Sequence, residues 1–456
     1  MKPTNTSAAQ TATTPAAHGA GPDLARAISK VNWRVLPLFV IMFIANYIDR
    51  VNIGFVRPHL KADLGIGAAA FGLGAGLFFI GYAIFEVPSN MLLQRFGAKA
   101  WLTRIMVTWG LAATAMAFVQ GEMSFYALRF LLGVAEAGFF PGVVFYFTRW
   151  LPRADRGKAM AVFLSGSAAA SVLSGPVSGG LLQVEGMGLH GWQWMFIIEG
   201  LFSVVLGVAV WFLLDSEPRD AKWLSDAERE ALTHEIAAEQ KEREADRPVG
   251  VSGWALLRDA QILLFCAIYF LISLTIYGAT FWLPTIIKKM GHYSEFQVGL
   301  FNSIPWLISI VAMYAFAALS RRYRHQQGWT AAAFAVAGVG MFASAATSDP
   351  VYGFVAICFA AIGFKAASSL FWPIPQSYLD VRVAAGVIAL INSLGNLGGF
   401  VAPAAFGILE QRTGSIQGGL YGLAFSSLLG AVAVMFARSR PTTGTPGTIP
   451  AVSSMK

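Results

Sequence analysis

The sequence predicts an all-α membrane protein in which twelve transmembrane helices form two six-helix halves around a central cavity. The chain has 456 residues, of which 56% are hydrophobic and only 13% are charged, and its mean hydropathy is +0.58. Soluble domains carry about 25% charged residues. The apolar residues form continuous runs of about 20, the length of a membrane-spanning helix, whereas a barrel would show short alternating segments. One long polar stretch divides these runs into two sets of six.

Clusters of glycine, proline and charge mark the ends of the apolar runs and predict the individual spans. The expected spans are 33–56, 68–90, 101–120, 124–147, 158–183, 193–214, 260–287, 296–319, 328–347, 351–373, 384–409 and 417–437. The expected domains are a disordered cytoplasmic tail over 1–30, an N-terminal half over 31–214, a linker over 215–258, a C-terminal half over 259–437 and a tail over 438–456. Both tails are polar, and the first has no apolar core of signal-peptide length.

The linker is expected to hold a solvated amphipathic helix. Ser225-Asp-Ala-Glu228 has the spacing of a capping box, in which the serine and glutamate side chains satisfy backbone N–H groups. The charged residues that follow form no catalytic constellation. Since an enzyme or a receptor would need a larger soluble domain than this linker, we expect neither.

Lysine and arginine are distributed unevenly between the two sides of the predicted bundle. If both termini lie on one side, that side carries 25 of the 33 basic residues and the other side carries 5. The other three, Arg50, Arg129 and Lys365, lie within spans or at their edges. The positive-inside rule therefore predicts a multi-pass protein of the cell inner (plasma) membrane with both termini in the cytoplasm. Anionic lipid accounts for the net charge of +8, so we expect no nucleic-acid partner.

No disulfide, metal site or cofactor is expected. The two cysteines, Cys266 and Cys358, fall in separate spans, where buried free thiols are usual. All six histidines fall in predicted tails, loops or the linker, so the side chain that titrates nearest neutral pH is missing from the spans. Carboxylates must then carry any proton that crosses the membrane with a solute.

Two sets of charges stand in the apolar runs. Asp49 and Arg50 close the first run, and Arg129 and Glu136 lie two turns apart on one face of the fourth. Because charges in lipid are costly, these side chains should face the bundle interior or a water-filled path. An arginine there offers permanently charged, planar donors that suit a carboxylate. The alternative is an ion pair that only holds helices together.

A third cation, Lys365, lies midway along the tenth span among small residues that leave room beside a cavity. It can hold a second carboxylate of a solute, or it can extend to an interface or pair with a glutamate. Trp372, further along the same span, can stack on an aromatic acid or fill the core.

Six plus six helices with a central linker is the arrangement of the major facilitator superfamily, and local sequences resemble it. Asn90-Met-Leu-Leu-Gln-Arg95-Phe-Gly97-Ala-Lys99, between spans two and three, is similar to the superfamily's loop motif. Arg95, Gly97 and Lys99 match, whereas Asn90 and Gln94 stand where that motif has glycine and aspartate, so the usual charge relay is incomplete. Gly175-Pro-Val-Ser-Gly-Gly180 resembles a motif linked to antiporters, although symporters carry similar glycines.

Several blocks, in order, resemble the anion:cation symporter family of that superfamily. They are Asn46-Tyr-Ile-Asp-Arg-Val-Asn-Ile-Gly54, Gly81-Tyr-Ala-Ile-Phe-Glu-Val-Pro-Ser-Asn90, Arg129 through Gly142, Trp192-Gln-Trp-Met-Phe-Ile-Ile-Glu-Gly200 and Asn392-Ser-Leu-Gly-Asn-Leu-Gly-Gly399. The resemblance implies import of an organic acid anion with protons by alternating access. The loops are more similar to the tartrate and phthalate branch than to the sugar-acid branch, so a dicarboxylate or an aromatic acid is the expected cargo.

The resemblance also implies roles for the charged residues. Asp49 and Glu136 match positions whose protonation is thought to drive symport. For the substrate anion, the planar and permanently charged donors of arginine make Arg50 the first choice, and Arg129 is also an expected substrate-binding residue. In this hypothesis Arg129 pairs with Asp49 or Glu136 in the empty carrier and is freed when the acids are protonated.

Polar residues at three other positions match substrate contacts in family members. These are Tyr47, Tyr82 and Asn396. The alternatives are interfacial anchors for the tyrosines and an interhelical hydrogen bond for the asparagine. Glu86 and Glu199 lie nearer predicted span ends, where a structural role is expected.

The same residues are compatible with two other modes of transport. An exchanger of organic anions would use the same arginines without obligatory proton coupling, and an efflux carrier would move an acid outward. The expected partners are therefore a small organic anion, protons and membrane lipids, and we expect a monomer.

Overall fold

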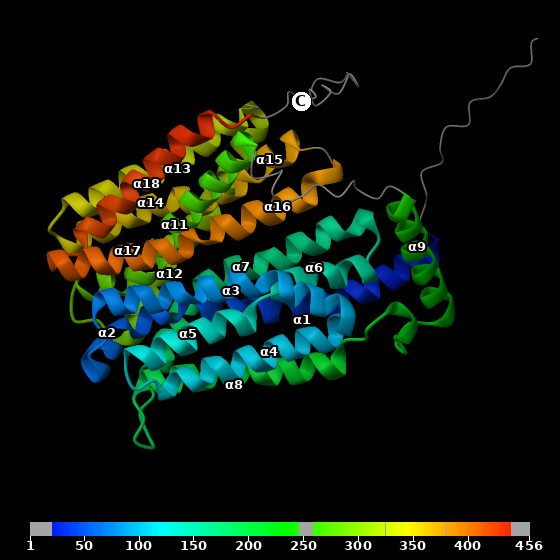
Figure 1. Ribbon diagram of the computed structural model, residues 1–456, viewed down its shortest axis with the longest axis horizontal. Helices are drawn as coiled ribbons and strands as arrows, with labels where there is room; N and C mark the ends of the chain where they lie inside the picture. Colours follow the sequence, from blue (N-terminus) through cyan, green and yellow to red (C-terminus); the bar gives the residue numbers. More distant parts are fainter. Residues whose placement is uncertain (1–20, 246–258, 324, 380, 439–456) are drawn as a thin grey trace, which may run out of the picture.

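The computed structural model describes residues 21–245, 259–323, 325–379 and 381–438. Within these ranges the chain forms helices and no strand, and the long helices run side by side along the longest axis (Figure 1). We call the end where α1 begins and α18 finishes the terminal end, and the opposite end the distal end. The predicted all-α architecture is confirmed.

The first six predicted spans correspond to the helices of what we call the N-terminal group. They are α1 (Pro22–Val51) with α2 (Ile53–Leu64), α3 (Ala68–Phe96), α4 (Ala98–Ala115) with the short η1 (Met116–Phe118), α5 (Glu122–Glu136) with α6 (Phe139–Trp150), α7 (Arg153–Leu181) and α8 (Gly191–Leu213). By length and composition, all but one of these six could cross a membrane. The exception is α4, whose hydropathy is lowered by Lys99, Arg104 and three threonines, but it packs along α8.

The last six predicted spans correspond to the C-terminal group. They are α11 (Ala260–Lys288), α12 (Glu295–Tyr323), α13 (Gln326–Ala346), α14 (Pro350–Phe371) with α15 (Pro373–Tyr378), α16 (Val381–Asn396) with α17 (Gly398–Thr413), and α18 (Gln417–Met435). In the described part of the chain, each of these six could cross a membrane.

Four of the spans are interrupted between two helices. The breaks fall at Asn52 between α1 and α2, at Ala137 and Gly138 between α5 and α6, at Trp372 between α14 and α15, and at Leu397 between α16 and α17. Gly138 has a φ of +90°, a conformation that favours glycine, and a Cβ there would overlap the side chain of Ser89. Interrupted helices in membrane transporters often surround the solute site, because the freed backbone groups and adjacent side chains face it.

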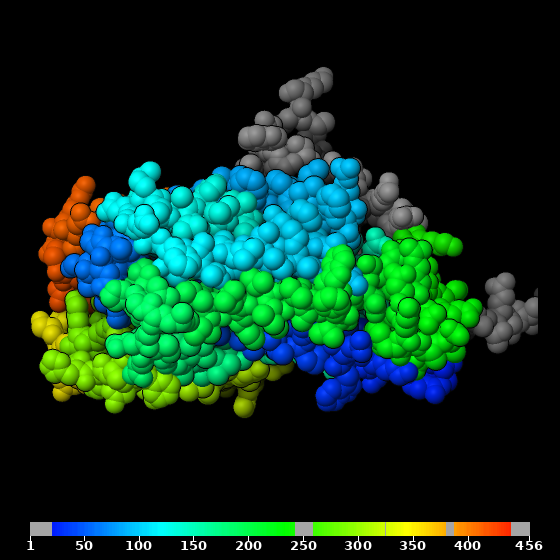
Figure 2. Space-filling model, turned by 90° about the horizontal axis from the view of Figure 1, so that it is seen from below, coloured from blue at the N-terminus to red at the C-terminus, as the bar shows by residue number. Residues whose placement is uncertain are grey.

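The linker packs against the terminal end of the N-terminal group. It contains η2 (Pro218–Asp220) and α9 (Asp226–Ala245), which lies beside the start of α1 (Figure 2). The capping box is confirmed: the Ser225 N–H donates to Glu228 over 2.9 Å, and the Glu228 N–H donates to Ser225 Oγ over 3.3 Å. Leu232 and Ile236 bury one face of the amphipathic helix.

The expected disordered tail over 1–30 is wrong for its last residues, because α1 begins at Pro22. Proline suits the first turn of a helix, and Asp23 complements the helix dipole there. Ala27 is buried, and Lys30 donates to Glu228 of α9 over 2.7 Å. Contacts with the linker therefore extend α1 beyond the apolar run. Residues 1–20 lie outside the described residues.

Several helix pairs join the two groups, among them α3 with α17 and α7 with α12. A Cβ on Gly175 of α7 would overlap the backbone of Gly299 on α12, and a Cβ on Gly72 of α3 would overlap the backbone of Pro403 on α17. Glycine permits this close backbone approach. Between described residues of the two groups, the hydrogen bonds, ion pairs and ring contacts lie from around the centre of the bundle to the distal end. The groups are thus joined at the distal end.

Candidate functional site

An ion pair stands at the centre of the N-terminal group, where two interrupted spans meet. Arg50 lies in the last turn of α1, Glu136 is the last residue of α5, and Nη2 of the arginine contacts Oε1 of the glutamate. The Glu136 side chain is 1% exposed and that of Arg50 is 17% exposed. The second arginine nitrogen, Nη1, donates to the hydroxyl of Tyr277 on α11 over 3.4 Å. Arg50 therefore joins its own group to the opposite one.

Aromatic rings enclose the guanidinium of Arg50. Its central carbon lies 5.2 Å from the ring centroid of Phe78 and 5.3 Å from that of Tyr82, both on α3. Such cation–π contacts stabilise a charge that is partly removed from water. Tyr82, one of the predicted substrate contacts, is thus placed beside the predicted anion-binding arginine.

The expected ion pair of Arg129 with Asp49 or Glu136 is not formed among the described residues, because Arg50 takes Glu136 instead. Arg129 is fully buried two turns earlier on α5. Its guanidinium lies over the Phe78 ring at 5.3 Å, and Nη2 is 3.5 Å from the carbonyl oxygen of Ala75. Nε and Nη1 have no hydrogen-bond partner within the described structure. A buried cation without an acidic partner makes the centre of the bundle electropositive.

Asp49 accepts hydrogen bonds from neutral donors of two other helices. Trp109 Nε1 of α4 donates over 2.6 Å, and Ser203 Oγ of α8 donates over 2.8 Å, both to Oδ2. The side chain is buried, and Oδ1 has no partner in the described part of the chain. Glu199, one turn from Ser203, is held in the same manner by Asn52 and Ser178. Both acids therefore link helices within the N-terminal group.

The expectation that Glu86 lies near a span end is wrong, because α3 continues to Phe96 rather than ending at residue 90. Glu86 is buried and accepts a hydrogen bond over 3.1 Å from Ser393 of α16. It therefore contacts the opposite group around the centre of the bundle.

Lys365 extends from α14 towards α1 of the opposite group. Its ammonium lies 5.3 Å from the ring centroid of Tyr47 and 5.9 Å from that of Trp306 on α12. No carboxylate lies within ion-pair distance of it among the residues that the structure describes. Tyr47 is three residues before Arg50, so the residue beside the Lys365 ammonium lies one turn of α1 from Arg50.

The other two predicted substrate contacts of the C-terminal group, Trp372 and Asn396, lie at helix breaks. Trp372 separates α14 from α15 and packs on Tyr269 at 4.8 Å between ring centroids. Asn396 is the last residue of α16. The packing on Tyr269 is consistent with a core role for Trp372, whereas Asn396 is only half buried.

The loop motif between spans two and three forms a one-residue turn. Gly97, with a φ of +83°, is the single residue between α3 and α4. Arg95 stacks on Phe96 at 5.6 Å, and Lys99 lies over Trp211 of α8 at 5.3 Å. In the described ranges neither cation has an acidic partner, as expected for a motif that lacks its aspartate.

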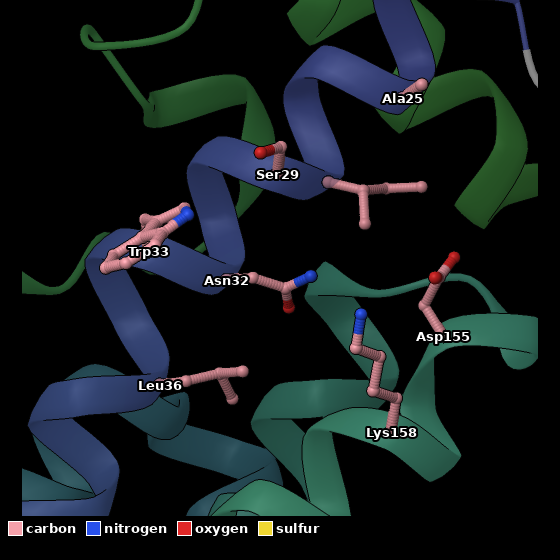
Figure 3. Close-up of a pocket in the computed structure, with 8 residues that line it drawn as sticks. Ala25, Ser29, Asn32, Trp33, Leu36, Asp155 and Lys158 are labelled. Carbon is pink, nitrogen blue, oxygen red and sulfur yellow. The ribbon is translucent and has the colours of Figure 1, made fainter.

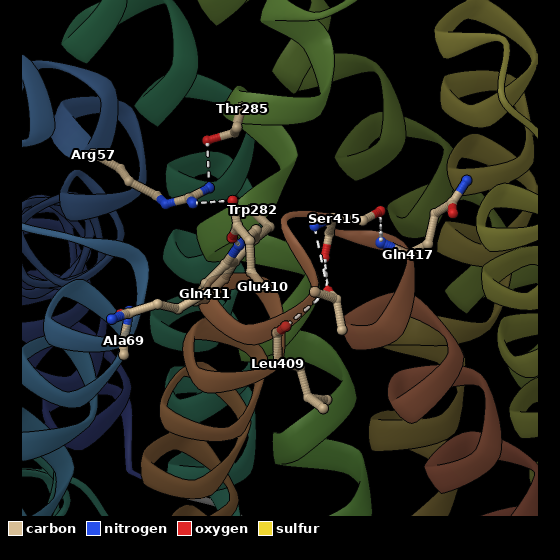
Figure 4. A network of polar contacts seen from close by, with 10 residues as sticks. Arg57, Ala69, Trp282, Thr285, Leu409, Glu410, Gln411, Ser415 and Gln417 are labelled. Carbon is tan, nitrogen blue, oxygen red and sulfur yellow. Dashed lines mark hydrogen bonds and ion pairs between the residues drawn. The ribbon is translucent and has the colours of Figure 1, made fainter.

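Sequence reasoning missed a polar network at the distal end, drawn in Figure 4. Arg57 of α2 contacts Glu410 of α17 over 2.5 Å and donates to Thr285 of α11 over 3.2 Å. Trp282 donates to the same glutamate over 2.7 Å. We call Arg57, Glu410, Trp282 and Thr285 the distal lock. A signal was present, since opposite charges end the first and eleventh predicted spans on the same side.

The expectation that His59 lies in a loop is wrong. Helix α2 continues to Leu64 and therefore includes His59. Its Nε2 lies 3.1 Å from Glu295 at the start of α12, and Lys288 contacts the same carboxylate over 2.5 Å. Two separate polar contacts, Arg57 with Glu410 and His59 with Glu295, thus join the groups near the distal end.

A cavity of about 300 Å³ lies at the terminal end, between α1 and the start of α7 (Figure 3). Its lining includes Asn32, Trp33, Asp155 and Lys158. Asn32 is roughly 27 Å from Arg50 along α1, at 1.5 Å per residue. This cavity is therefore separate from the charged centre.

Two groups of helices long and apolar enough to cross a membrane, with charges held at the contact between them, have the architecture of a multi-pass membrane transporter. The chain belongs to the Major Facilitator Superfamily, whose sequence profile matches residues 39–403, and it is therefore a transporter rather than an enzyme. The relatives described next are consistent with the anion:cation symporter branch that the motifs resemble.

Bacterial relatives cover nearly the whole chain. A quinolone resistance transporter of Acinetobacter baumannii is 42% identical over 89% of this chain and 93% of its own. A protein of Agrobacterium vitis named as a tartrate transporter is 40% identical over 91% of this chain and 92% of its own. Relatives of this kind point to the inner membrane.

Solved structures share the fold. The inward open conformation of the xylose transporter XylE from Escherichia coli has a TM-score of 0.72 at 12% identity, covering 90% of this chain and 97% of its own. A bacterial homologue of the human lysosomal transporter Spinster has a TM-score of 0.68 at 15% identity, covering 92% and 96%.

Proposed function

We propose that this transporter is a proton-coupled symporter that imports an organic acid anion by alternating access. The observation that carries the proposal is the pairing of Arg50 with Glu136 beside Tyr277 of the opposite group. A titratable acid and a permanently charged donor share one contact at the place where the two groups meet. The relatives named as tartrate transporters support an organic acid as cargo.

Coupling follows from competition for one arginine. In the empty, deprotonated carrier Glu136 neutralises Arg50. Protonation of Glu136 removes its negative charge and frees the guanidinium for a carboxylate of the substrate. Proton binding and anion binding therefore favour each other, and by linkage each strengthens the other by the same factor.

Asp49 is the second proposed proton carrier. Its hydrogen-bond donors, Trp109 and Ser203, are neutral and leave its charge uncompensated. A buried charge of this kind opposes occlusion in a low-dielectric interior, so a proton on Asp49 favours the loaded, occluded form. Arg129 adds a fixed positive charge nearby and attracts the anion without contacting an acid.

The positive-inside distribution supports a terminal end in the cytoplasm, and in that orientation the distal lock lies on the outer side. The described contacts between the groups, which lie around the centre and at the distal end, then correspond to an inward-facing carrier. Outward opening requires the distal lock and the close approach of Gly175 to Gly299 to separate.

Uptake by the purified protein in liposomes tests the proposal. Radiolabelled tartrate or phthalate should accumulate above the external concentration when the outside is made acidic, and should only equilibrate without a gradient. Accumulation that is the same with and without the gradient would contradict proton coupling.

A carrier that exports an acidic drug is the second candidate, favoured by the relative named as a quinolone resistance transporter. Quinolones carry a carboxylate, so the same arginine would bind them. The direction of net flux in inside-out vesicles separates the two, since export would load the vesicles with drug and anion import would not. An exchanger of organic anions would instead require an anion on both sides of the membrane and no proton gradient.

A further inference from the structure

We propose that Lys365 and Arg50 form a two-cation site for a compact dicarboxylate, which bridges the two helix groups. This inference rests on the proposed transport of organic anions and names the charge of the substrate. One carboxylate binds Arg50 of α1, and the other binds Lys365 of α14.

The first observation is that Lys365 lacks a counter-charge. It lies near the centre of the bundle, between the rings of Tyr47 and Trp306, and no described acid is within ion-pair distance. Aromatic faces stabilise an ammonium but do not neutralise it. Since a lysine in a membrane interior is costly unless it pairs, its position favours an anion supplied from outside the protein.

The second observation is that tyrosines lie beside both cations. The hydroxyl of Tyr277 accepts a hydrogen bond from Arg50 over 3.4 Å, and Tyr47, whose ring centroid lies 5.3 Å from the Lys365 ammonium, is three residues before Arg50 on α1. The ring of Tyr277 packs on Phe79 at 4.5 Å, which fixes its position at the contact between the groups. The hydroxyl can therefore donate to an anion that lies between the two cations.

The third observation concerns charge. Glu136 pairs with Arg50, whereas no acid among the described residues pairs with Lys365. A dianion bound with Glu136 protonated neutralises both cations, but a monoanion leaves one of them uncompensated. Occlusion of the loaded site is therefore less costly with a dianion. Because the two cations belong to opposite groups, the same dianion draws these groups together.

The rings of Tyr47, Tyr82 and Trp306 lie beside the two cations as aromatic walls. Such walls suit a small planar carbon frame between the carboxylates. The substrate class is thus a short or aromatic dicarboxylate.

Binding of matched acids to the full-length purified protein tests the site. Tartrate and phthalate are compared with their half-amides, in which one carboxylate is a carboxamide of nearly the same shape. The wild-type protein should bind each diacid at least about tenfold more tightly than its half-amide, the effect of one charge-assisted contact. Lys365→Met should reduce that ratio to about twofold or less, whereas Lys365→Arg should keep most of it.

Lys61→Met is the matched control, because Lys61 is exposed on α2 and should leave the ratio unchanged. A ratio near one in the wild-type protein, or an unchanged ratio in Lys365→Met, overturns the two-cation site while proton-driven uptake can persist. Failure of the wild-type protein to bind either diacid or either half-amide overturns the proposed anion transport as well.

Discussion

Arg57 and Glu410 are separated by 353 positions in the sequence and form an ion pair across the two helix groups. Their side chains are 10% and 16% exposed, so the pair is largely shielded from water. The indole of Trp282 donates to the second oxygen of the same carboxylate, and the ring also lies 5.1 Å from the guanidinium. The distal lock thus pairs both charges while the distal end is closed, and opening of that end must break the ion pair.

Loss of the lock should expose the interface behind it. Thr280 of α11 is buried about five residues nearer the centre than Thr285. A cysteine at position 280, in a chain whose Cys266 and Cys358 are serine, reports on opening. Glu410→Gln should speed its labelling by an impermeant maleimide on intact cells about tenfold, because a shielded arginine loses its counter-charge.

Arg412→Gln serves as the matched control for the lock. Arg412 is exposed near Glu410 on the same helix, and its replacement should leave the labelling rate unchanged. Equal labelling rates in Glu410→Gln and its parent would show that Arg57 and Glu410 do not hold the distal end closed.

A side chain at position 175 should change which conformation the transporter adopts, rather than prevent it from folding. A Cβ at this position overlaps the Gly299 backbone only while α7 and α12 are in contact at the distal end. Gly175→Val should therefore favour the outward-open form and speed labelling of the same reporter cysteine. At Gly180, where the nearest neighbour of a Cβ is a Phe296 side-chain atom at 3.6 Å, Gly180→Val should have little effect.

The contact of α9 with α1 should weaken in acid. The hydrogen bond from Lys30 holds the pKa of Glu228 below its ordinary value of 4.5. Since the folded-state pKa is the lower one, the contact stabilises the docked linker above 4.5 and is lost as the pH falls below it. Amide hydrogen exchange in α9, corrected for the intrinsic rate, should increase between about pH 7 and about pH 3.5.

Glu228→Gln is the control for this pH dependence. Its α9 should exchange rapidly at both pH values, since the amide cannot titrate. An equal acid response in the variant and the wild-type protein would assign the response to another group.

Much of the fold could be predicted because lipid restricts the solutions. Continuous apolar runs admit only helices, and the polar stretch 215–258 separates two sets of six. The ends of two helices could not be predicted from the apolar runs, since α3 continues through Glu86 to Phe96 and α1 begins at Pro22. In both cases the extra residues are held by packing and polar contacts outside the apolar run.

The candidate site could be predicted in part, for an energetic reason. Arg50, Glu136 and Lys365 stand out because a charge within an apolar run is costly unless it has a function. Tyr277 and Glu410 do not stand out, because a tyrosine in a span and a charge at its end are common at membrane interfaces. Which acid pairs with which arginine depends on the crossing of α1 and α5, which the sequence pattern does not specify.

The exchange of Glu136 for a substrate carboxylate on Arg50 is tested most directly by proton uptake during binding. Purified protein in a weakly buffered solution with a pH dye should take up at least one proton for each tartrate or phthalate bound, because Glu136 and Asp49 are both proposed proton carriers. Glu136→Gln should bind the same acid with about one proton fewer, and should still exchange it across liposomes while its proton-driven accumulation weakens. Binding with no proton uptake in the wild-type protein, or with equal uptake in Glu136→Gln, would contradict the account.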